Sequence, residues 1–230
     1  MSAPVRVFLA GEGSNELGVH ARDPAYRAEG GSPGVLCVLL TKVQPDGWQV
    51  SGAKLWKDIH KLRVGAARGG SVVHQDTRNV LKLAVIAEEA GHDVLVFSRD
   101  LDADKERKDA VEEGLRRAAE VCPGLGLVGG VAVPALEGWV LALLKVAKTE
   151  SFSRERAQAQ LGARGFAPKD GAAMVDAIAD SDPAALPHDA DSLRTWLARA
   201  QVVLPPRVAA SEGTAPRGSS KESGHGKLRR

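Results

Sequence analysis

One stretch of the chain, VLVFSRDLDAD at residues 94–104, constrains the fold most strongly because an apolar run ends in three alternating carboxylates. The run Val94 to Phe97 has the β-branched and aromatic character of a buried strand. Asp100, Asp102 and Asp104 would then lie where this strand opens into a loop, and open α/β sheets bind ligands at the carboxyl ends of their strands. Neighbouring anions repel one another unless a cation lies between them, so we expect Mg²⁺ or Mn²⁺ here.

Length and composition exclude several classes of protein. The 230 residues suffice for one domain of ordinary size and an appendage, and the net charge of +2 does not by itself indicate a nucleic-acid partner. Cys37 and Cys122 form no CxxC pair, which argues against a zinc knuckle or a disulfide scaffold. No signal peptide is evident and no apolar run reaches the roughly 18 residues of a membrane span, so we expect a cytoplasmic protein with no membrane partner.

Strand and helix patterns alternate along the first two thirds of the chain. Besides the strand at 94–97, apolar runs predict strands at Pro4 to Ala10, Val35 to Leu40 and Leu127 to Val133. Helical spacing of apolar residues predicts helices over 53–63, 77–90, 105–121 and 136–147, with Asp76 as the N-cap of the second. The alternation favours an α/β fold with a mostly parallel sheet flanked by helices on both faces.

The pattern of predicted secondary structure changes near Ser151. Short helices are predicted over 153–161, 169–179 and 191–203, separated by prolines and with no strand between them. Beyond Pro205 the composition turns to Ser, Gly, Pro and basic residues, which is typical of disorder. We therefore predict an α/β domain over 1–148, a small C-terminal helical extension over 149–204 and a disordered basic tail over 205–230.

Three motifs in this order point to a known family. Glu12 lies in EGSNE after the first strand, the alternating aspartates follow a later strand, and PALEGW at 134–139 opens a helix. Over about residues 5–144 the sequence resembles the Toprim group, the Rossmann-like metal-dependent fold of topoisomerases, primases and OLD-type nucleases. It is most similar to small stand-alone bacterial Toprim proteins. The resemblance implies that Glu12, Asp100 and Asp102 are catalytic and hold Mg²⁺ together.

The implied activity is Mg²⁺-dependent cleavage of nucleic-acid phosphodiesters. Mg²⁺ keeps several waters, so one or two carboxylates and a substrate phosphate can anchor it, and a second metal about 4 Å away could activate the attacking water. Glu12 could instead act as a general acid or base. Asp104 and Glu16 are candidates for the second ion or its waters. Glu137 is a supporting candidate because the resembled proteins share its Glu-x-Trp element.

Several of these residues have simpler interpretations. Asp104 could be only the N-cap of the helix that follows it, and the helix dipole would favour Glu137 in a first turn. Trp139, two positions from Glu137, faces another side of the helix and is expected in the core. An EF-hand is excluded, because Lys105 stands where the loop needs glycine and Val111 where it needs glutamate.

A basic segment is predicted to contact nucleic-acid phosphates beside the metal. A solvated helix face is the alternative. Its members are Lys54, Lys57, Lys61, Arg63 and Arg68, with Arg78, Lys82, Lys105, Arg107 and Lys108 as an extension.

The expected partners are nucleic acid, DNA ahead of RNA, and an ATPase by analogy with OLD-type proteins. This fold-level analogy suggests DNA processing or defence against phage and plasmids. Two other functions stay open: a non-catalytic metal- or nucleic-acid-binding partner of an ATPase, and a small-molecule phosphatase or phosphotransferase. A haloacid dehalogenase also uses DxD, but ordinarily after its first strand, whereas strands precede the motif here.

Overall fold

The computed structural model describes residues 3–18, 32–61, 73–168 and 170–204. The predicted basic tail over 205–230 lies outside these ranges, as do Arg63 and Arg68 of the predicted basic segment. Within the described ranges, none of the helices has both the length and the apolar character needed to cross a lipid bilayer.

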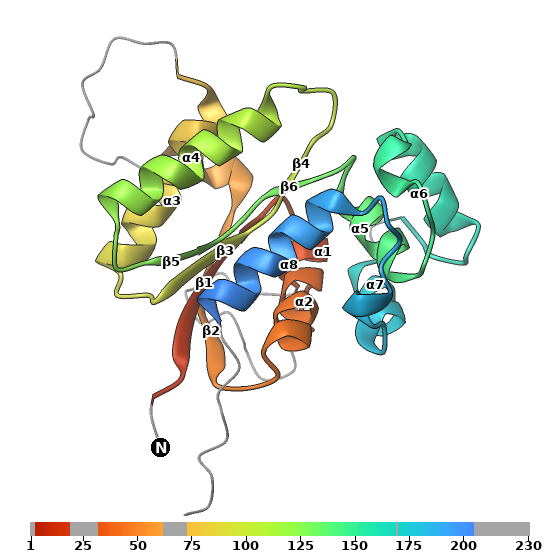
Figure 1. Ribbon diagram of the computed structural model, residues 1–230, viewed down its shortest axis with the longest axis horizontal. Helices are drawn as coiled ribbons and strands as arrows, with labels where there is room; N and C mark the ends of the chain where they lie inside the picture. The colour runs from red at the N-terminus through yellow and green to blue at the C-terminus, as the bar shows by residue number, and fades with distance from the viewer. Residues whose placement is uncertain (1–2, 19–31, 62–72, 169, 205–230) are drawn as a thin grey trace, which may run out of the picture.

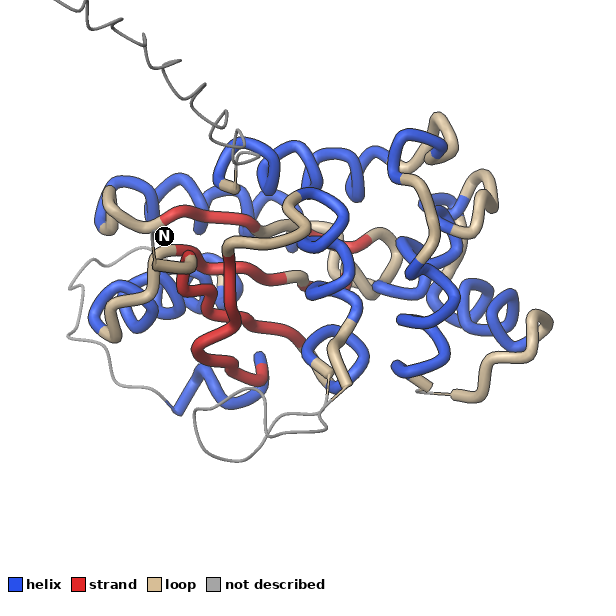
Figure 2. Tube along the Cα trace, turned by 90° about the horizontal axis from the view of Figure 1, so that it is seen from below, coloured by secondary structure: helices blue, strands red, loops and turns tan. Residues whose placement is uncertain are grey.

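The centre of the fold is a four-stranded parallel sheet in the order β2-β1-β3-β5. In the sequence β4 follows β3 and β6 follows β5, and β4 and β6 form a short parallel pair of their own. Figure 2 shows the strands as a layer between helices, so the predicted α/β fold with a parallel sheet flanked by helices is confirmed and is Rossmann-like. The strands are β1 Val5–Gly11, β2 Trp48–Leu55, β3 Val94–Phe97, β4 Arg99–Asp100, β5 Gly126–Val128 and β6 Val131–Ala132.

The two central strands are apolar at successive positions because both of their faces are buried. Alternate side chains of each strand enter opposite cores, which explains why the sequence reads as a continuous apolar run. One core receives Val7, Leu9, Val94 and Val96, and the other receives Phe8, Ala10, Leu95 and Phe97.

Helices α3 Gln75–Glu89 and α4 Arg107–Val121 pack against each other on one face of the sheet. The other face is covered by α2 Val35–Val43 and α8 Asp191–Val203 (Figure 1). Trp196 of α8 is fully buried and donates its Nε1–H to the carbonyl oxygen of Phe97 at 2.9 Å. Helix α8, the last helix of the described residues, therefore completes the layer that covers the sheet.

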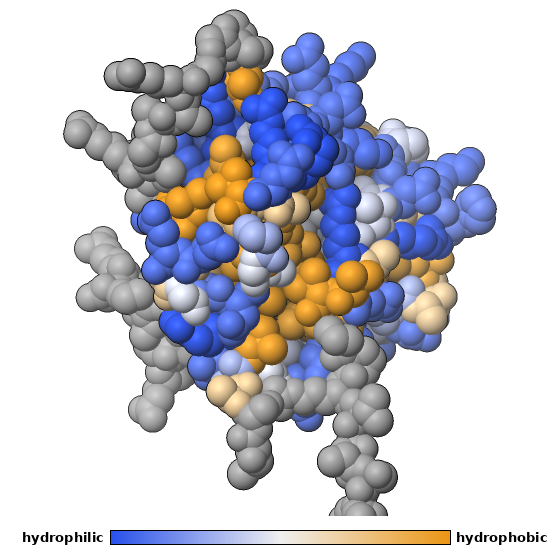
Figure 3. Space-filling model, turned by 60° about the vertical axis from the view of Figure 1, so that its left-hand side comes forward, coloured by the Kyte–Doolittle hydropathy of each residue, from blue (hydrophilic) through white to orange (hydrophobic). Residues whose placement is uncertain are grey.

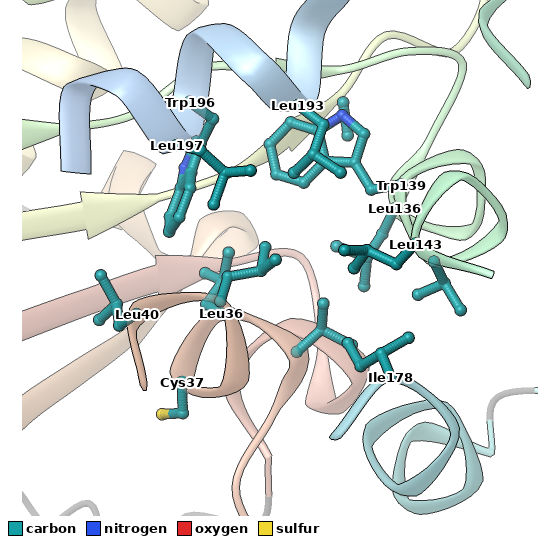
Figure 4. Packing of buried hydrophobic residues seen from close by; sticks show 14 of the residues in the cluster. Leu36, Cys37, Leu40, Leu136, Trp139, Leu143, Ile178, Leu193, Trp196 and Leu197 are labelled. Carbon is teal, nitrogen blue, oxygen red and sulfur yellow. The ribbon is translucent and has the colours of Figure 1, made fainter. Parts of the chain in front are cut away.

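Helices α5, α6 and α7 gather at one end of the molecule, and the short helix α1 lies next to α2 and β1 (Figure 1). Figure 4 shows the apolar contacts that join α5, α7, α8 and α2 there. Trp139 is only 1% exposed and donates its Nε1–H to Ser192 Oγ at 2.8 Å, so its predicted place in the core is confirmed. These elements are α1 Ser14–Leu17, α5 Leu136–Leu143, α6 Arg154–Gly162 and α7 Gly171–Ala179, with 3-10 turns at Thr149–Ser151 and Pro183–Ala185.

Two predicted elements are wrong in type. The apolar run Val35 to Leu40 is not a strand but most of helix α2, which is buried between the sheet and neighbouring helices. The predicted helix over 53–63 is instead the end of β2, which pairs with β1 up to Leu55, followed by the 3-10 helix η1 Trp56–Lys61. In both places tertiary packing decides the structure, since short apolar runs and short helical spacings fit either element.

The start of α3 also differs from the prediction. Asp76 is not the N-cap: His74 holds that position, and its Nδ1 accepts the backbone N–H of Asp76 at 3.1 Å. Asp76 lies in the first turn of the helix and is only 4% exposed. Its carboxylate is therefore buried and available to partners inside the protein.

The surface contrasts with these cores. The outward side of α4 carries ion pairs from Glu113 to Arg116 and Arg117. The face drawn in Figure 3 is largely hydrophilic, with an apolar patch between the hydrophilic regions.

The close contact between Gly129 and Phe97 gives a test of the fold. A Cβ at position 129 would overlap the Phe97 ring, which is fully buried, so Gly129→Ala should lower the free energy of unfolding by about 1–3 kcal/mol. Gly162→Ala is the control, because a Cβ there meets nothing within 4 Å and alanine favours a helix. Urea denaturation of both variants measures the effect, and equal stability of the two would contradict the packing described.

Candidate active site

The parallel pairing of β1 with β3 brings two of the predicted site residues together. Ala10 is in register with Phe97, so the chain segments that leave the two strands start side by side. Glu12 and Asp100 follow on these segments, and the backbone N–H of Asp100 donates to Glu12 Oε1 at 3.1 Å. Both residues therefore lie at the same carboxyl edge of the sheet, where α/β proteins commonly bind ligands.

Four carboxylates line one cavity at this edge. The cavity has a volume of about 520 Å³, and its lining includes Glu12, Glu16, Asp100 and Glu137. Glu16 comes from α1 and Glu137 from the first turn of α5, as predicted for the latter. Among the described lining residues, Arg154 alone carries a positive charge. The cavity thus concentrates negative charge from separate parts of the chain.

Asp100 is the most strongly perturbed of these groups. The residue is 3% exposed, Oδ1 accepts the backbone N–H of Leu136 at 2.9 Å, and Oδ2 lies 3.5 Å from Arg154 Nη2. Burial, followed by repulsion from Glu12 and Glu16, raises the pKa of Asp100 from 3.8 to about 8. At neutral pH the carboxyl therefore keeps a proton, unless a cation takes the place of that proton.

Glu16 shares this environment. It is 5% exposed, and burial raises its pKa although Oε2 accepts the backbone N–H of Gly13 at 2.9 Å, which acts in the opposite direction. The charges of Glu12 and Glu137 add to the increase. Two buried carboxyls with raised pKa values thus face the same cavity, a pattern associated with functional sites.

The other two carboxylates are held by specific donors. Arg99 forms a short ion pair with Glu12 Oε1, and its guanidinium also lies over the ring of Trp56, 5.4 Å from the centroid. Gln158 of α6 donates its Nε2–H to Glu137 Oε1 at 3.3 Å. These contacts fix the orientation of each carboxylate before any ligand arrives.

Asp102 points to a different set of partners. Its backbone adopts a left-handed conformation with φ of 50°, and the residue does not line the cavity. One carboxylate oxygen accepts from Arg154 Nη1 at 2.6 Å and the other from Arg107 Nη1 at 3.0 Å. The structure therefore separates the predicted aspartate pair: Asp100 faces the cavity, and Asp102 holds the arginine that lies beside it.

Asp104 belongs to a second polar cluster. Together with His74 and Asp76 it offers ligand atoms that all lie within 4.8 Å of one another, so this group could hold a metal ion. However, Arg107 already lies 2.9 Å from Asp76 and 3.6 Å from Asp104, which compensates their charge. Asp104 also accepts the backbone N–H of Glu106 at 3.2 Å, but it is not the N-cap of α4, because Glu106 holds that position.

The predicted basic segment is placed only in part. Lys54 lies in β2 in register with Ala10, so it is near the carboxyl ends of the strands, and Lys57 is exposed in η1, which Lys61 ends. Arg107 is 9% exposed and bound to the buried carboxylate of Asp76, so the prediction that it extends a basic surface is wrong.

Sequence reasoning missed the arginines of the site. Arg99 directly precedes Asp100 in the sequence, so its place near the site could have been predicted, and in the structure it pairs with Glu12. Arg154 lies on a separate helix, and only tertiary packing brings it to Asp100. Comparisons of the chain with family models, with curated proteins and with solved structures found no significant match.

The raised pKa of Asp100 makes the stability of the metal-free protein depend on pH. Between about pH 4 and pH 8 the folded state holds a proton on Asp100 that the unfolded state has released, so the free energy of unfolding should fall as the pH rises. Asp100→Asn should flatten this dependence by up to about 1.4 kcal/mol per pH unit. Urea denaturation in a metal chelator measures both proteins, and identical pH slopes would contradict the assignment.

Proposed function

We propose that this chain is a Mg²⁺- or Mn²⁺-dependent nuclease of the Toprim type, which cleaves phosphodiester bonds of nucleic acids. The observation that supports the proposal most is the convergence of Glu12, Glu16, Asp100 and Glu137 in one cavity at the carboxyl edge of a parallel sheet. The motif resemblance to the Toprim group names two of the same residues, Glu12 and Asp100.

The donor set of the cavity fits a hard divalent cation. Carboxylate oxygens are the protein ligands that Mg²⁺ and Mn²⁺ prefer, and the buried Asp100 carboxyl is in surroundings that favour exchange of its proton for a cation. Glu12 and Asp100 would hold the ion directly, since both residues line the cavity. A bound ion would polarise a substrate phosphate and lower the pKa of a bound water.

Arg154 would act on the substrate rather than on the metal. Asp102 holds its guanidinium at 2.6 Å, and the same group lies 3.5 Å from Asp100 Oδ2, so it would be beside a phosphate that enters the cavity. Arginine binds phosphate through two parallel N–H donors, which fixes its orientation. In this proposal Asp102 positions Arg154 and is not a ligand of the ion, a change from the role implied by the family resemblance.

The remaining carboxylates would prepare the site. Glu16 and Glu137 keep the electrostatic potential of the cavity negative, which favours cation entry, and the bond from Gln158 keeps Glu137 in place. Either side chain is placed to orient water around the ion. The basic residues Lys54 and Lys57 would hold more distant phosphates of a polynucleotide, with DNA as the first substrate to examine.

A second candidate is a phosphatase or phosphotransferase that acts on small phosphoesters. The cavity volume of about 520 Å³ favours it, because that volume is in the range of small-molecule sites. An ATPase partner, and a role in DNA processing or in defence against phage or plasmids, remain proposals from the resemblance to OLD-type proteins alone.

Incubation with plasmid, single-stranded DNA and RNA tests the proposal. With Mg²⁺ or Mn²⁺ we expect cleavage that a chelator abolishes and that Glu12→Gln or Asp100→Asn lowers by about 100-fold or more, because each change removes a carboxylate from the reacting centre. Glu113→Gln is the matched control, since Glu113 is on the outer side of α4 and pairs with Arg116.

Two outcomes would contradict the nuclease. Cleavage that survives in both cavity variants would mean that the observed activity arises elsewhere. Hydrolysis of a generic phosphomonoester with all three nucleic acids left intact would favour the phosphatase instead.

A further inference from the structure

The lining of the cavity combines charged and polar residues with apolar ones. Beyond the carboxylates, its wall is formed by Leu161, Phe166, Ala167, Pro168 and Met174, which come from α6, α7 and the segment between them. Any ligand that fills it must therefore combine a charged part with an apolar part. Inorganic phosphate alone would leave the apolar residues without a partner.

Two residues of the apolar wall belong to the core of the protein, whereas Ala167 and Pro168 are exposed. Leu161 and Met174 are 3% and 2% exposed and belong to the same core as the sheet and α5. Phe166 packs against this core but stays partly exposed, so one side of its ring remains available at the cavity. Because part of the wall is anchored in this way, that part is formed before a ligand binds.

Helix α6 contributes both polar and apolar side chains to the cavity. Arg154, Gln158 and Leu161 of α6 all line the cavity, and their spacing of four and three residues places them along one side of the helix. The side chains thus run from a cation beside Asp100, through an amide, to an apolar group. A nucleotide has the same order of groups: an anionic phosphate, a sugar with hydroxyl or ether oxygens, and a flat base.

We propose that the cavity takes a single unpaired nucleotide, with its phosphate at the Asp100 end and its base against Phe166. This proposal rests on the proposed metal-dependent function and specifies the part of the substrate that enters the site. The volume of about 520 Å³ suits one nucleotide, whereas a base pair with its two backbones would need far more room. A base stacks on an aromatic side chain whatever its identity, so sequence preference should be weak.

Calorimetric titration of the full chain in Mg²⁺ tests the proposal with three probes: adenosine 5′-monophosphate, adenosine and inorganic phosphate. We expect the monophosphate to bind at least about tenfold more tightly than inorganic phosphate, because stacking adds to the phosphate contacts. Phe166→Ala should remove this advantage and leave the affinity for inorganic phosphate unchanged. Phe152→Ala is the matched control, since Phe152 lies in the same helical region beside Arg156 and does not line the cavity.

A competition experiment tests whether the bound nucleotide must be free of base pairing. A single-stranded oligonucleotide should compete with adenosine 5′-monophosphate for the cavity, and a relaxed, covalently closed circular duplex should not. Equal competition by both would overturn the proposal that the nucleotide is unpaired.

The remaining outcomes separate the two proposals. If nucleic acid is cleaved but the monophosphate binds no more tightly than inorganic phosphate, the nucleotide site is wrong and the nuclease stands. If the monophosphate shows the Phe166-dependent advantage but no nucleic acid is cleaved, the nucleotide site stands and the nuclease is wrong. If none of the three probes binds, the nucleotide site is wrong whatever the activity.

Discussion

The pairing of β1 with β3 is the constraint on which the candidate site depends. Because the two strands are parallel and adjacent, Glu12 and Asp100 leave the sheet at the same edge and their polar groups meet at 3.1 Å. The strands are held in place by cores on both faces, so this edge is rigid. A shift in their register would move Asp100 away from Glu12 and turn alternate apolar side chains to the wrong face.

Burial of like charges gives the site its chemical character. Acidic side chains that face one another in a partly closed cavity raise the free energy of the ionised state, which is seen in the raised pKa values of Asp100 and Glu16. A protein retains such an arrangement at a cost to its own stability. A divalent cation that replaces the proton of Asp100 removes this cost, and its positive charge attracts an anionic substrate. Binding of the ion and of an anionic substrate would then be coupled.

Much of the sheet could be predicted from the sequence, because β1 and β3 carry the apolar runs of strands that are buried on both faces. Helix α2 could not, since Val35 to Leu40 is apolar throughout and has no polar face to set its period. For the site, the rule that ligands lie at strand ends was enough to find Glu12 and Asp100. It did not predict the partners of Asp102 and Asp104, which follow a left-handed turn at Asp102 and contact Arg107 and His74. Arg154 and the apolar wall arise from helix packing, which short motifs do not encode.

A titration with Mn²⁺, followed by electron paramagnetic resonance, tests most directly whether the ion binds in the cavity. The account predicts that Mn²⁺ binds to the unmodified protein and that Glu12→Gln and Asp100→Asn each weaken binding by about tenfold or more, since each removes a ligand oxygen. His74→Asn and Asp104→Asn, which alter the other cluster with metal-binding geometry, should leave the affinity unchanged. Binding that survives in Asp100→Asn and is lost in His74→Asn would place the ion in that other cluster and contradict the account.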